Sequence, residues 1–195
     1  MLVLRTLAWI ACVIYSTIPA FWLLIHPHAE YWRSRRKSPY KILLPIWVGM
    51  WAVTAVTTAH WHGVLLYEDR WTWIPAAVLF CAGLILYKLS RNQFSLEQLG
   101  GLPEIVRGHG QQRLITTGIR AHVRHPIYLA HLCEILAWSV GTGLAVCWAL
   151  SAWAIVTGAI MIKMEDEELR KRFGEAYRQY QSTVPAILPT TKLNR

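Results

Sequence analysis

Arg124, His125 and Pro126 stand together immediately before an apolar run of the sequence. Proline is favoured at the first position of a helix, because its missing N–H would have no partner there. We therefore expect a helix to begin at Pro126, with its free N–H groups and the positive end of its dipole beside Arg124 and His125. Such a place suits an anion, for example a carboxylate or a phosphate. The alternative is an arginine that reaches toward lipid headgroups, followed by a helix-starting proline.

Three polar side chains follow on one face of this expected helix: Tyr128, His131 and Glu134, spaced three residues apart. Ionisable groups at membrane depth usually face a cavity lined by protein. His131 and Glu134, together with Arg124, are therefore the candidate catalytic residues. A His–Glu pair satisfied within a helical bundle is the alternative.

An acidic run, residues 165–168, lies in a second segment with helical spacing. Three of its acids have a base four positions later: Asp166 with Arg170, Glu167 with Lys171 and Glu168 with Arg172. Glu165 instead shares its stripe with Leu169, so it faces the protein and needs a cation from elsewhere. Acids that complement a helix dipole would explain the other three but not Glu165. Together with the helix start at Pro126, this carboxylate would fit a ligand with one carboxylate and one ammonium.

A bundle of membrane helices must position these residues. The chain has 195 residues, of which 54% are hydrophobic and 16% are charged, and its apolar runs lie at about 7–25, 42–61, 71–89, 126–140 and 143–162. About 20 apolar residues cross a hydrocarbon core. We therefore expect an all-α membrane protein with about five spans. Residues 1–90 would form a transmembrane scaffold, and 91–195 a long polar connector (residues 90–118), a short C-terminal helical hairpin and a cytoplasmic tail helix, all within one structural domain.

The chain has a net charge of +9, and its basic residues are distributed unevenly between the two sides of the predicted spans. Eighteen of the twenty Lys and Arg residues lie on one side of the predicted spans, and only Arg5 and Arg70 lie on the other. This asymmetry predicts an N-terminus outside the membrane and a cytoplasmic C-terminus, and it excludes nucleic acid as the reason for the basic charge. The four cysteines fall inside apolar runs without metal-ligand spacing, so we expect neither disulfides nor a metal site.

The pattern "RLITTGIRAHVRHPIY", followed by a hairpin and "EDEELRKRFGEAYRQYQSTVPAILP", is similar to that of integral-membrane isoprenylcysteine carboxyl methyltransferases and phospholipid methyltransferases. The resemblance covers about residues 110–189. It implies S-adenosylmethionine as the cofactor, an active site on the cytoplasmic side, and a lipophilic or prenylated acceptor or a membrane lipid. It also implies the residues that hold the cofactor: Gln112, Arg113, Leu114, Ile115, Arg120, His125, Pro126, Ile127, Tyr128 and Glu165.

Two positions differ from the pattern of the family. Arg120 stands where a tyrosine is usual, and Met161 stands where the isoprenylcysteine enzymes tend to carry an arginine that engages the substrate. Lys163 is the nearest cation, on another face of the helix. Met161 and Lys163 are therefore candidate substrate residues, and methyl transfer is expected to a lipophilic, membrane-borne acceptor that is isoprenylcysteine carboxylate-like or a related lipid.

Three other functions remain open. Sterol reductases of the same membrane fold bind NADPH and continue the "RHPNY" motif with a glycine and an acid, whereas Leu129, Ala130 and His131 follow here. A non-enzymatic carrier or haem-handling protein would use the eight histidines. A degenerate methyltransferase that acts as a partner subunit is the third possibility. Cofactor binding separates the first two from methyl transfer.

Overall fold

The computed structural model describes residues 2–34, 38–91 and 113–188. These ranges are helical and contain no strand: α1 (Leu2–Trp22), α2 (Ala29–Ser34), α3 (Tyr40–Thr58), α4 (Trp73–Arg91), α7 (Pro126–Thr142), α8 (Ala145–Phe173) and α9 (Glu175–Thr183), with short 3-10 turns between some of them. Four helical stretches are long and apolar enough to cross a membrane, at Leu2–Ser34, Tyr40–Trp61, Arg70–Arg91 and Ala145–Phe173. The chain is an all-α membrane protein, as expected.

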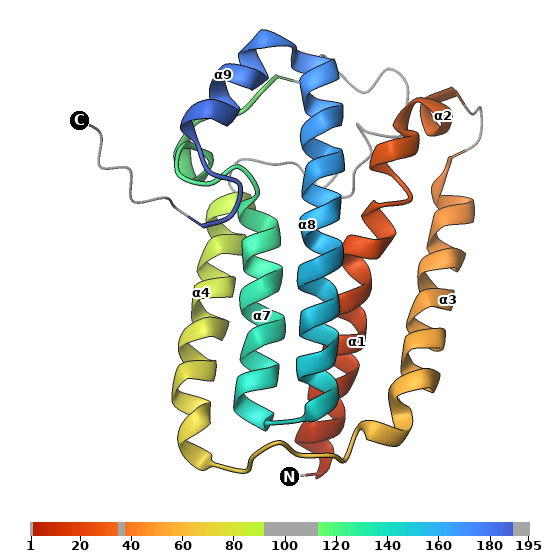
Figure 1. Cartoon of the computed structure of the whole chain (residues 1–195), viewed down its shortest axis with the longest axis vertical. Coiled ribbons are helices and arrows are strands. Elements are labelled where there is room, and N and C mark those ends of the chain that lie inside the picture. Colours follow the sequence, from red (N-terminus) through yellow and green to blue (C-terminus); the bar gives the residue numbers. More distant parts are fainter. Residues whose placement is uncertain (1, 35–37, 92–112, 189–195) are drawn as a thin grey trace.

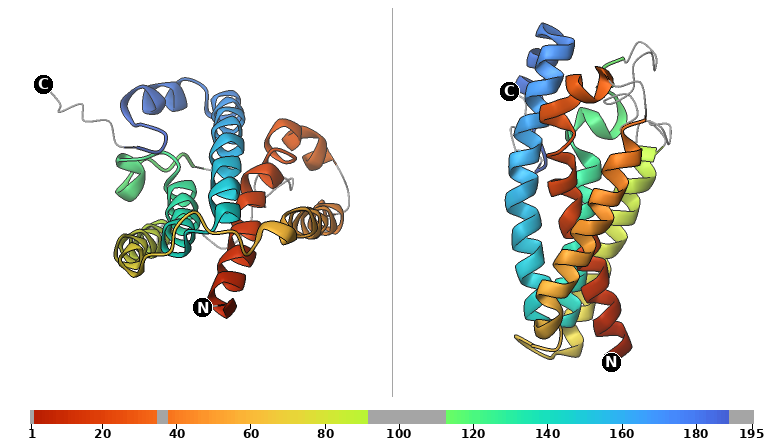
Figure 2. Two further views of the ribbon diagram at one scale, coloured as in Figure 1. Left: turned by 60° about the horizontal axis from the view of Figure 1, so that its bottom comes forward. Right: turned by 90° about the vertical axis from the view of Figure 1, so that its right-hand side faces the viewer.

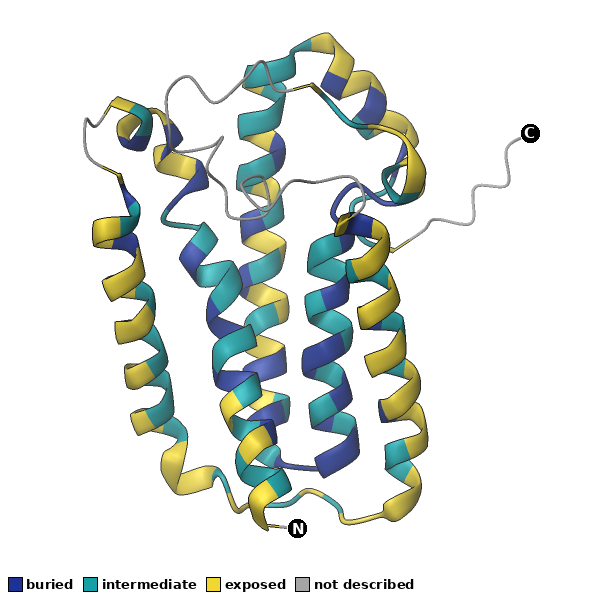
Figure 3. Cartoon of the chain, turned by 180° about the vertical axis from the view of Figure 1, so that it is seen from behind, coloured by how far each residue is buried: buried dark blue, intermediate teal, exposed yellow. Residues whose placement is uncertain are grey.

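The long helices run roughly side by side (Figure 1). α7 packs along α4 and α1, α8 packs on α1 and α7, and α3 contacts the bundle mainly through α1. Figure 2 shows α3 at one edge of the bundle and α4 at another. The outward faces of α3 and α4 are apolar and exposed, for example at Val53, Val56 and Val78 (Figure 3), as expected for surfaces that meet lipid.

α8 is longer than the sequence analysis expects. It has 29 residues, about 43 Å, and it carries the acidic run within itself rather than in a separate tail helix. The reason is that Lys, Glu, Leu and Arg are all good helix formers, so the helix continues beyond its apolar part until Gly174 (φ +59°). The second arm of the hairpin therefore is not short. α7, the first arm, has 17 residues.

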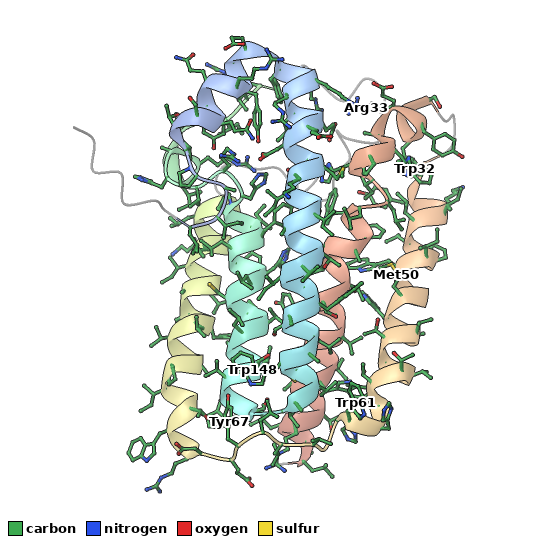
Figure 4. All side chains as sticks on the ribbon, in the orientation of Figure 1. Trp32, Arg33, Met50, Trp61, Tyr67 and Trp148 are labelled. Carbon is green, nitrogen blue, oxygen red and sulfur yellow. The ribbon has the colours of Figure 1, made fainter. Side chains whose placement is uncertain are left out.

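The hairpin between α7 and α8 turns at Gly143, which has φ +66°. The loop between α3 and α4 clasps this turn: Leu66 N–H donates to the Gly143 carbonyl at 2.8 Å, and Ala145 N–H donates to the Val64 carbonyl at 2.9 Å. Tyr67 lies across the lower ends of α7 and α8 (Figure 4) and donates from its hydroxyl to the Val140 carbonyl at 2.9 Å. The turn and the loop therefore fix each other.

We expect Gly143→Ala to destabilise the protein by at least about 1–3 kcal/mol, because only glycine adopts this φ without strain. A Cβ at this position would also lie 2.3 Å from the Tyr67 carbonyl oxygen. Thermal unfolding in detergent measures the effect. The matched control is Gly49→Ala in α3, where a Cβ meets nothing within 4 Å. Equal melting temperatures for the two variants would contradict the prediction.

The two ends of the bundle differ in composition. The N-terminus, the α3–α4 loop and the α7–α8 turn share one end, where Arg5 pairs with Glu68 at 2.5 Å, and α2 and α9 lie at the other end (Figure 1). Arg5 and Arg70 thus lie at the end opposite α9. This alternation agrees with the predicted distribution of basic residues, while the side of the membrane that each end faces stays a prediction.

Candidate functional site

The backbone before α7 is held by the segment that follows α9. Pro126 is its first residue and His125 its N-cap. The segment after α9 runs alongside: Arg124 N–H donates to the Pro185 carbonyl at 2.9 Å, and His125 N–H donates to the Ala186 carbonyl at 3.0 Å. The "VPAILP" motif therefore acts as a strap that fixes the backbone immediately before the helix, and these two N–H groups are occupied within the protein.

Asp166 is the centre of the polar cluster, and it is only 6% exposed. Its carboxylate accepts from Arg124 Nη2 at 2.8 Å and from Gln181 Nε2 at 2.9 Å, and it also accepts from the Tyr177 hydroxyl. His125 Nε2 lies 3.1 Å from its Oδ1. The expected pair of Asp166 with Arg170 is therefore wrong, because α8 turns this acid toward the α7 start and α9 rather than toward solvent.

Glu165 faces the protein, as its helical stripe predicts. Its side chain is 17% exposed, and its Oε2 lies 3.2 Å from His125 Nδ1. The cation that it needs thus comes from another element. His26 Nε2 lies 3.9 Å from the same oxygen. His125 at the start of α7 and the Glu165 carboxylate of α8 are in direct contact. The structure therefore brings together the two halves of the expected ligand site.

His125 predicts a pH dependence of stability. Burial lowers the pKa of its imidazole, but Glu165 and Asp166 raise it more, so the folded pKa lies above the ordinary 6.5. The charged ring then contributes stability that is complete below about pH 6.5 and is lost as the pH rises through the folded value. We expect the loss of melting temperature caused by His125→Asn to shrink between about pH 6 and about pH 9.

Thermal unfolding in detergent at the two pH values tests this dependence. The control is His122→Asn, which replaces an exposed histidine three residues away. The control should behave like the wild type at both pH values. A His125→Asn deficit that stays constant, or that grows with pH, would contradict the assigned ion pairs.

His26 is a site residue that the sequence analysis missed. It is buried at the end of the α1 segment, in the 3-10 turn η1 (His26–His28), and its ring stacks on Trp22. Its Nδ1 lies 3.0 Å from Glu168 Oε2, and Arg33 Nη2 donates to Glu168 Oε1 at 2.5 Å. Figure 4 shows Arg33 on the side of α2 that faces the upper part of α8. The N-terminal half therefore contributes directly to the polar cluster.

Of the ion pairs predicted between residues four positions apart, the pair of Glu168 is present and that of Glu167 is replaced. Glu168 pairs with Arg172 at 3.8 Å, as predicted, although His26 and Arg33 contact it more closely. Glu167 lies 4.0 Å from Arg170 rather than next to Lys171. These contacts lie on the side of α8 away from the strap.

Only a few residues of the predicted connector belong to the described structure. Gln112 and most of residues 90–118 lie outside the described residues. Arg113 is exposed, Leu114 packs against Tyr177 and Tyr180, and Ile115 is half-buried. The Arg120 carbonyl accepts from the Tyr180 hydroxyl at 2.6 Å. This segment therefore joins the cluster mainly through α9.

A cavity of about 210 Å³ lies directly below the cluster, between α1, α7 and α8. Tyr128, His131 and Met161, all predicted site residues, line it, and Ile187 from the strap closes its upper end. Ile155, also in its wall, is 48% exposed, so part of this wall lies at the apolar surface of the bundle. Tyr128 stacks on His125 with ring centroids 5.6 Å apart, and thus connects the cluster to the cavity.

Two predicted residues lie elsewhere. Glu134 is 2% exposed and packs against α4, where a Cβ at Gly83 would lie 2.6 Å from its Oε1. It does not line the cavity, and no hydrogen bond between it and His131 occurs in the described structure. Lys163 is exposed and also does not line the cavity. Ile127 is half-buried in the first turn of α7.

The chain is similar at low identity to an isoprenylcysteine methyltransferase, to a metal-resistance protein and to a sterol reductase. It is 34% identical over 89 residues to protein-S-isoprenylcysteine O-methyltransferase B of Arabidopsis thaliana. This match covers 43% of this chain and 43% of that protein. It is 30% identical over 155 residues to the nickel-cobalt-cadmium resistance protein NccN of Alcaligenes xylosoxydans xylosoxydans, covering 76% of this chain and 67% of that protein. It is 27% identical over 140 residues to the delta(14)-sterol reductase TM7SF2 of Mus musculus, and this match covers 64% of this chain and 33% of that protein.

The chain spans less than half of the length of the plant methyltransferase. No protein-family model matches it, and no solved structure matches it. Within residues 2–34, 38–91 and 113–188, no group of three or more His, Cys, Asp or Glu side chains is arranged to hold a metal ion.

Proposed function

Because the chain belongs to the isoprenylcysteine methyltransferase-like family of integral-membrane proteins, we propose that it transfers a methyl group from S-adenosylmethionine to a lipophilic acceptor. The observation that carries this proposal is the contact between Glu165 and His125 directly above an apolar cavity. A polar cofactor from the aqueous side and a lipophilic acceptor from the bilayer would then meet at Tyr128.

The residues present fit this cofactor. Glu165 Oε2 is buried and lies 3.2 Å from His125 Nδ1, so the cofactor's ammonium would share this carboxylate with the His125 ring. The N–H of Ile127 belongs to the first turn of α7, where a helix has no internal acceptor for it, and it suits the cofactor's carboxylate. Arg124 and the N–H of His125 are already bonded to Asp166 and to the strap, so they position the site rather than bind the ligand.

When bound, S-adenosylmethionine supplies an electrophilic methyl group, and the protein supplies orientation and exclusion of water. The Tyr128 ring, at the junction of cluster and cavity, would favour the cationic sulfonium by a cation–π contact. Helices α1, α7 and α8 would hold the acceptor in line with that methyl group. In this arrangement the C-terminus and the site face the cytoplasm and the N-terminus faces outward, as the basic residues predict.

The test is transfer of label in membranes. Membranes that contain the protein are incubated with methyl-labelled S-adenosylmethionine, and the lipid extract and the protein fraction are counted separately. We expect label in the lipid extract, and none in membranes that contain the Glu165→Gln variant. Equal label in wild-type and variant membranes would contradict the proposed site, and an absence of labelled lipid would contradict the proposed acceptor class.

An NADPH-dependent reduction is the second candidate, because the chain is also similar to a sterol reductase. Calorimetry with the purified protein in detergent separates the two. Binding of S-adenosylmethionine without binding of NADPH supports methyl transfer, and the opposite result supports reduction.

A further inference from the structure

The described walls of the cavity below the polar cluster carry no Lys or Arg. Within residues 2–34, 38–91 and 113–188, the walls come from α1 (Tyr15 and Pro19), from α7 and α8, and from Ile187 of the strap. Met161 occupies part of the wall and is fully buried. An acceptor that carries a carboxylate would therefore lose its water of hydration here and gain no partner charge from these side chains, which leaves it to rely on the cofactor's own sulfonium. Such a transfer is strongly unfavourable.

An acceptor whose reacting group is uncharged meets no such cost. A thiol or a phenol is neutral at physiological pH and enters an apolar cavity much as a hydrocarbon does. It becomes a strong nucleophile only when it loses its proton, so the cavity must offer a base.

His131 is the base that the cavity offers. It lines the cavity, and its Nδ1 is buried with no hydrogen-bond partner in the described part of the chain. Its ring lies among three tyrosines, with centroid distances of 5.7 Å to Tyr15, 5.4 Å to Tyr87 and 6.4 Å to Tyr128. Because Tyr128 also stacks on His125, one ring separates this base from the cluster in which Glu165 lies.

Resting on the proposed methyl transfer, we propose that the acceptor is a lipophilic weak acid with an uncharged reacting group, a thiol or a phenol, and that His131 takes its proton. As the acceptor's sulfur or oxygen bonds to the methyl carbon, the carbon–sulfonium bond breaks and its electron pair stays on the cofactor's sulfur. The acceptor's proton moves to the free imidazole nitrogen of His131, which later returns it to water. The products are a methyl thioether or aryl ether and neutral S-adenosylhomocysteine.

The experiment compares acceptors of matched lipophilicity with methyl-labelled cofactor and purified protein in lipid nanodiscs. The acceptors are farnesyl thiol, a long-chain alkylphenol, and N-acetyl-S-farnesylcysteine, which carries a carboxylate. We expect label in farnesyl thiol or in the alkylphenol, and none in the acceptor that carries a carboxylate. Comparison of the first two acceptors identifies whether the enzyme prefers a thiol or a phenol. Label only in the carboxylate would overturn the inference while leaving methyl transfer intact.

The role of His131 is tested with His131→Gln. We expect the rate with the alkyl thiol to fall by about 10²- to 10⁴-fold at unchanged cofactor affinity, whereas His122→Gln, at an exposed position, should match the wild type. The deficit should shrink with an alkylthiophenol, because a more acidic thiol needs less help from a base. A uniform deficit across these thiols would refute proton transfer to His131. Failure of the wild type to bind the cofactor by calorimetry would instead refute the proposed function, and this inference with it.

Discussion

Replacing Glu165 by glutamine is expected to weaken S-adenosylmethionine binding by at least about 100-fold, which corresponds to about 2.7 kcal/mol. In the proposed complex, this carboxylate is the counter-charge of the cofactor's ammonium in a site that is largely shielded from water, since its side chain is 17% exposed. Removing one partner of a buried charge pair leaves the other uncompensated, and this typically costs 2–5 kcal/mol or more. Glutamine keeps the size of the side chain, so packing should change little.

Calorimetry in detergent measures the effect, with Glu167→Gln as the matched control. Glu167 lies two residues further along α8, carries the same charge and has a side chain that is 57% exposed. Its replacement should change the affinity by less than about twofold, because an exposed pair contributes little. Similar affinities for the two variants and the wild type would remove Glu165 from the cofactor site. A similar loss in both variants would indicate a general effect of charge rather than a specific contact.

The features that the sequence predicts correctly are those set by neighbouring residues. The helix start at Pro126 follows from the conformational limits of proline. The inward direction of Glu165 follows from helical spacing, since it shares a stripe with Leu169. The apolar runs predict the helices of the bundle because a membrane requires about 20 apolar residues for each crossing.

The features that the sequence does not predict depend on contacts between residues that are far apart in the chain. Asp166 has Arg170 four positions away and Arg124 forty-two positions away, and only the packing of α8 against the α7 start decides in favour of Arg124. His26 pairs with Glu168 across 142 positions, and nothing in the N-terminal apolar run marks this histidine as different from an interfacial one. The length of α8 was underestimated because hydropathy locates the lipid boundary, whereas the helix itself ends at Gly174.

Asp166 is expected to be the residue whose loss destabilises the cluster most. From α8 it contacts four side chains on two other segments, namely Arg124 and His125 before α7 and Tyr177 and Gln181 of α9. Asp166→Ala would leave the Arg124 guanidinium, which is 7% exposed, buried without its carboxylate. Breaking a buried ion pair in this way typically costs about 3–5 kcal/mol.

Unfolding in detergent, together with hydrogen exchange of the α9 amides, measures this loss. We expect Asp166→Ala to lower the stability and to speed exchange in residues 175–183, because α9 loses its anchor on α8. Glu167→Ala, next to it but exposed, should change the stability by less than about 0.5 kcal/mol. The double variant Arg124→Met with Asp166→Ala should recover much of the deficit, because replacing both charges removes the unpaired one. If the losses of Asp166→Ala and Arg124→Met simply add, Arg124 and Asp166 do not stabilise the protein as a pair.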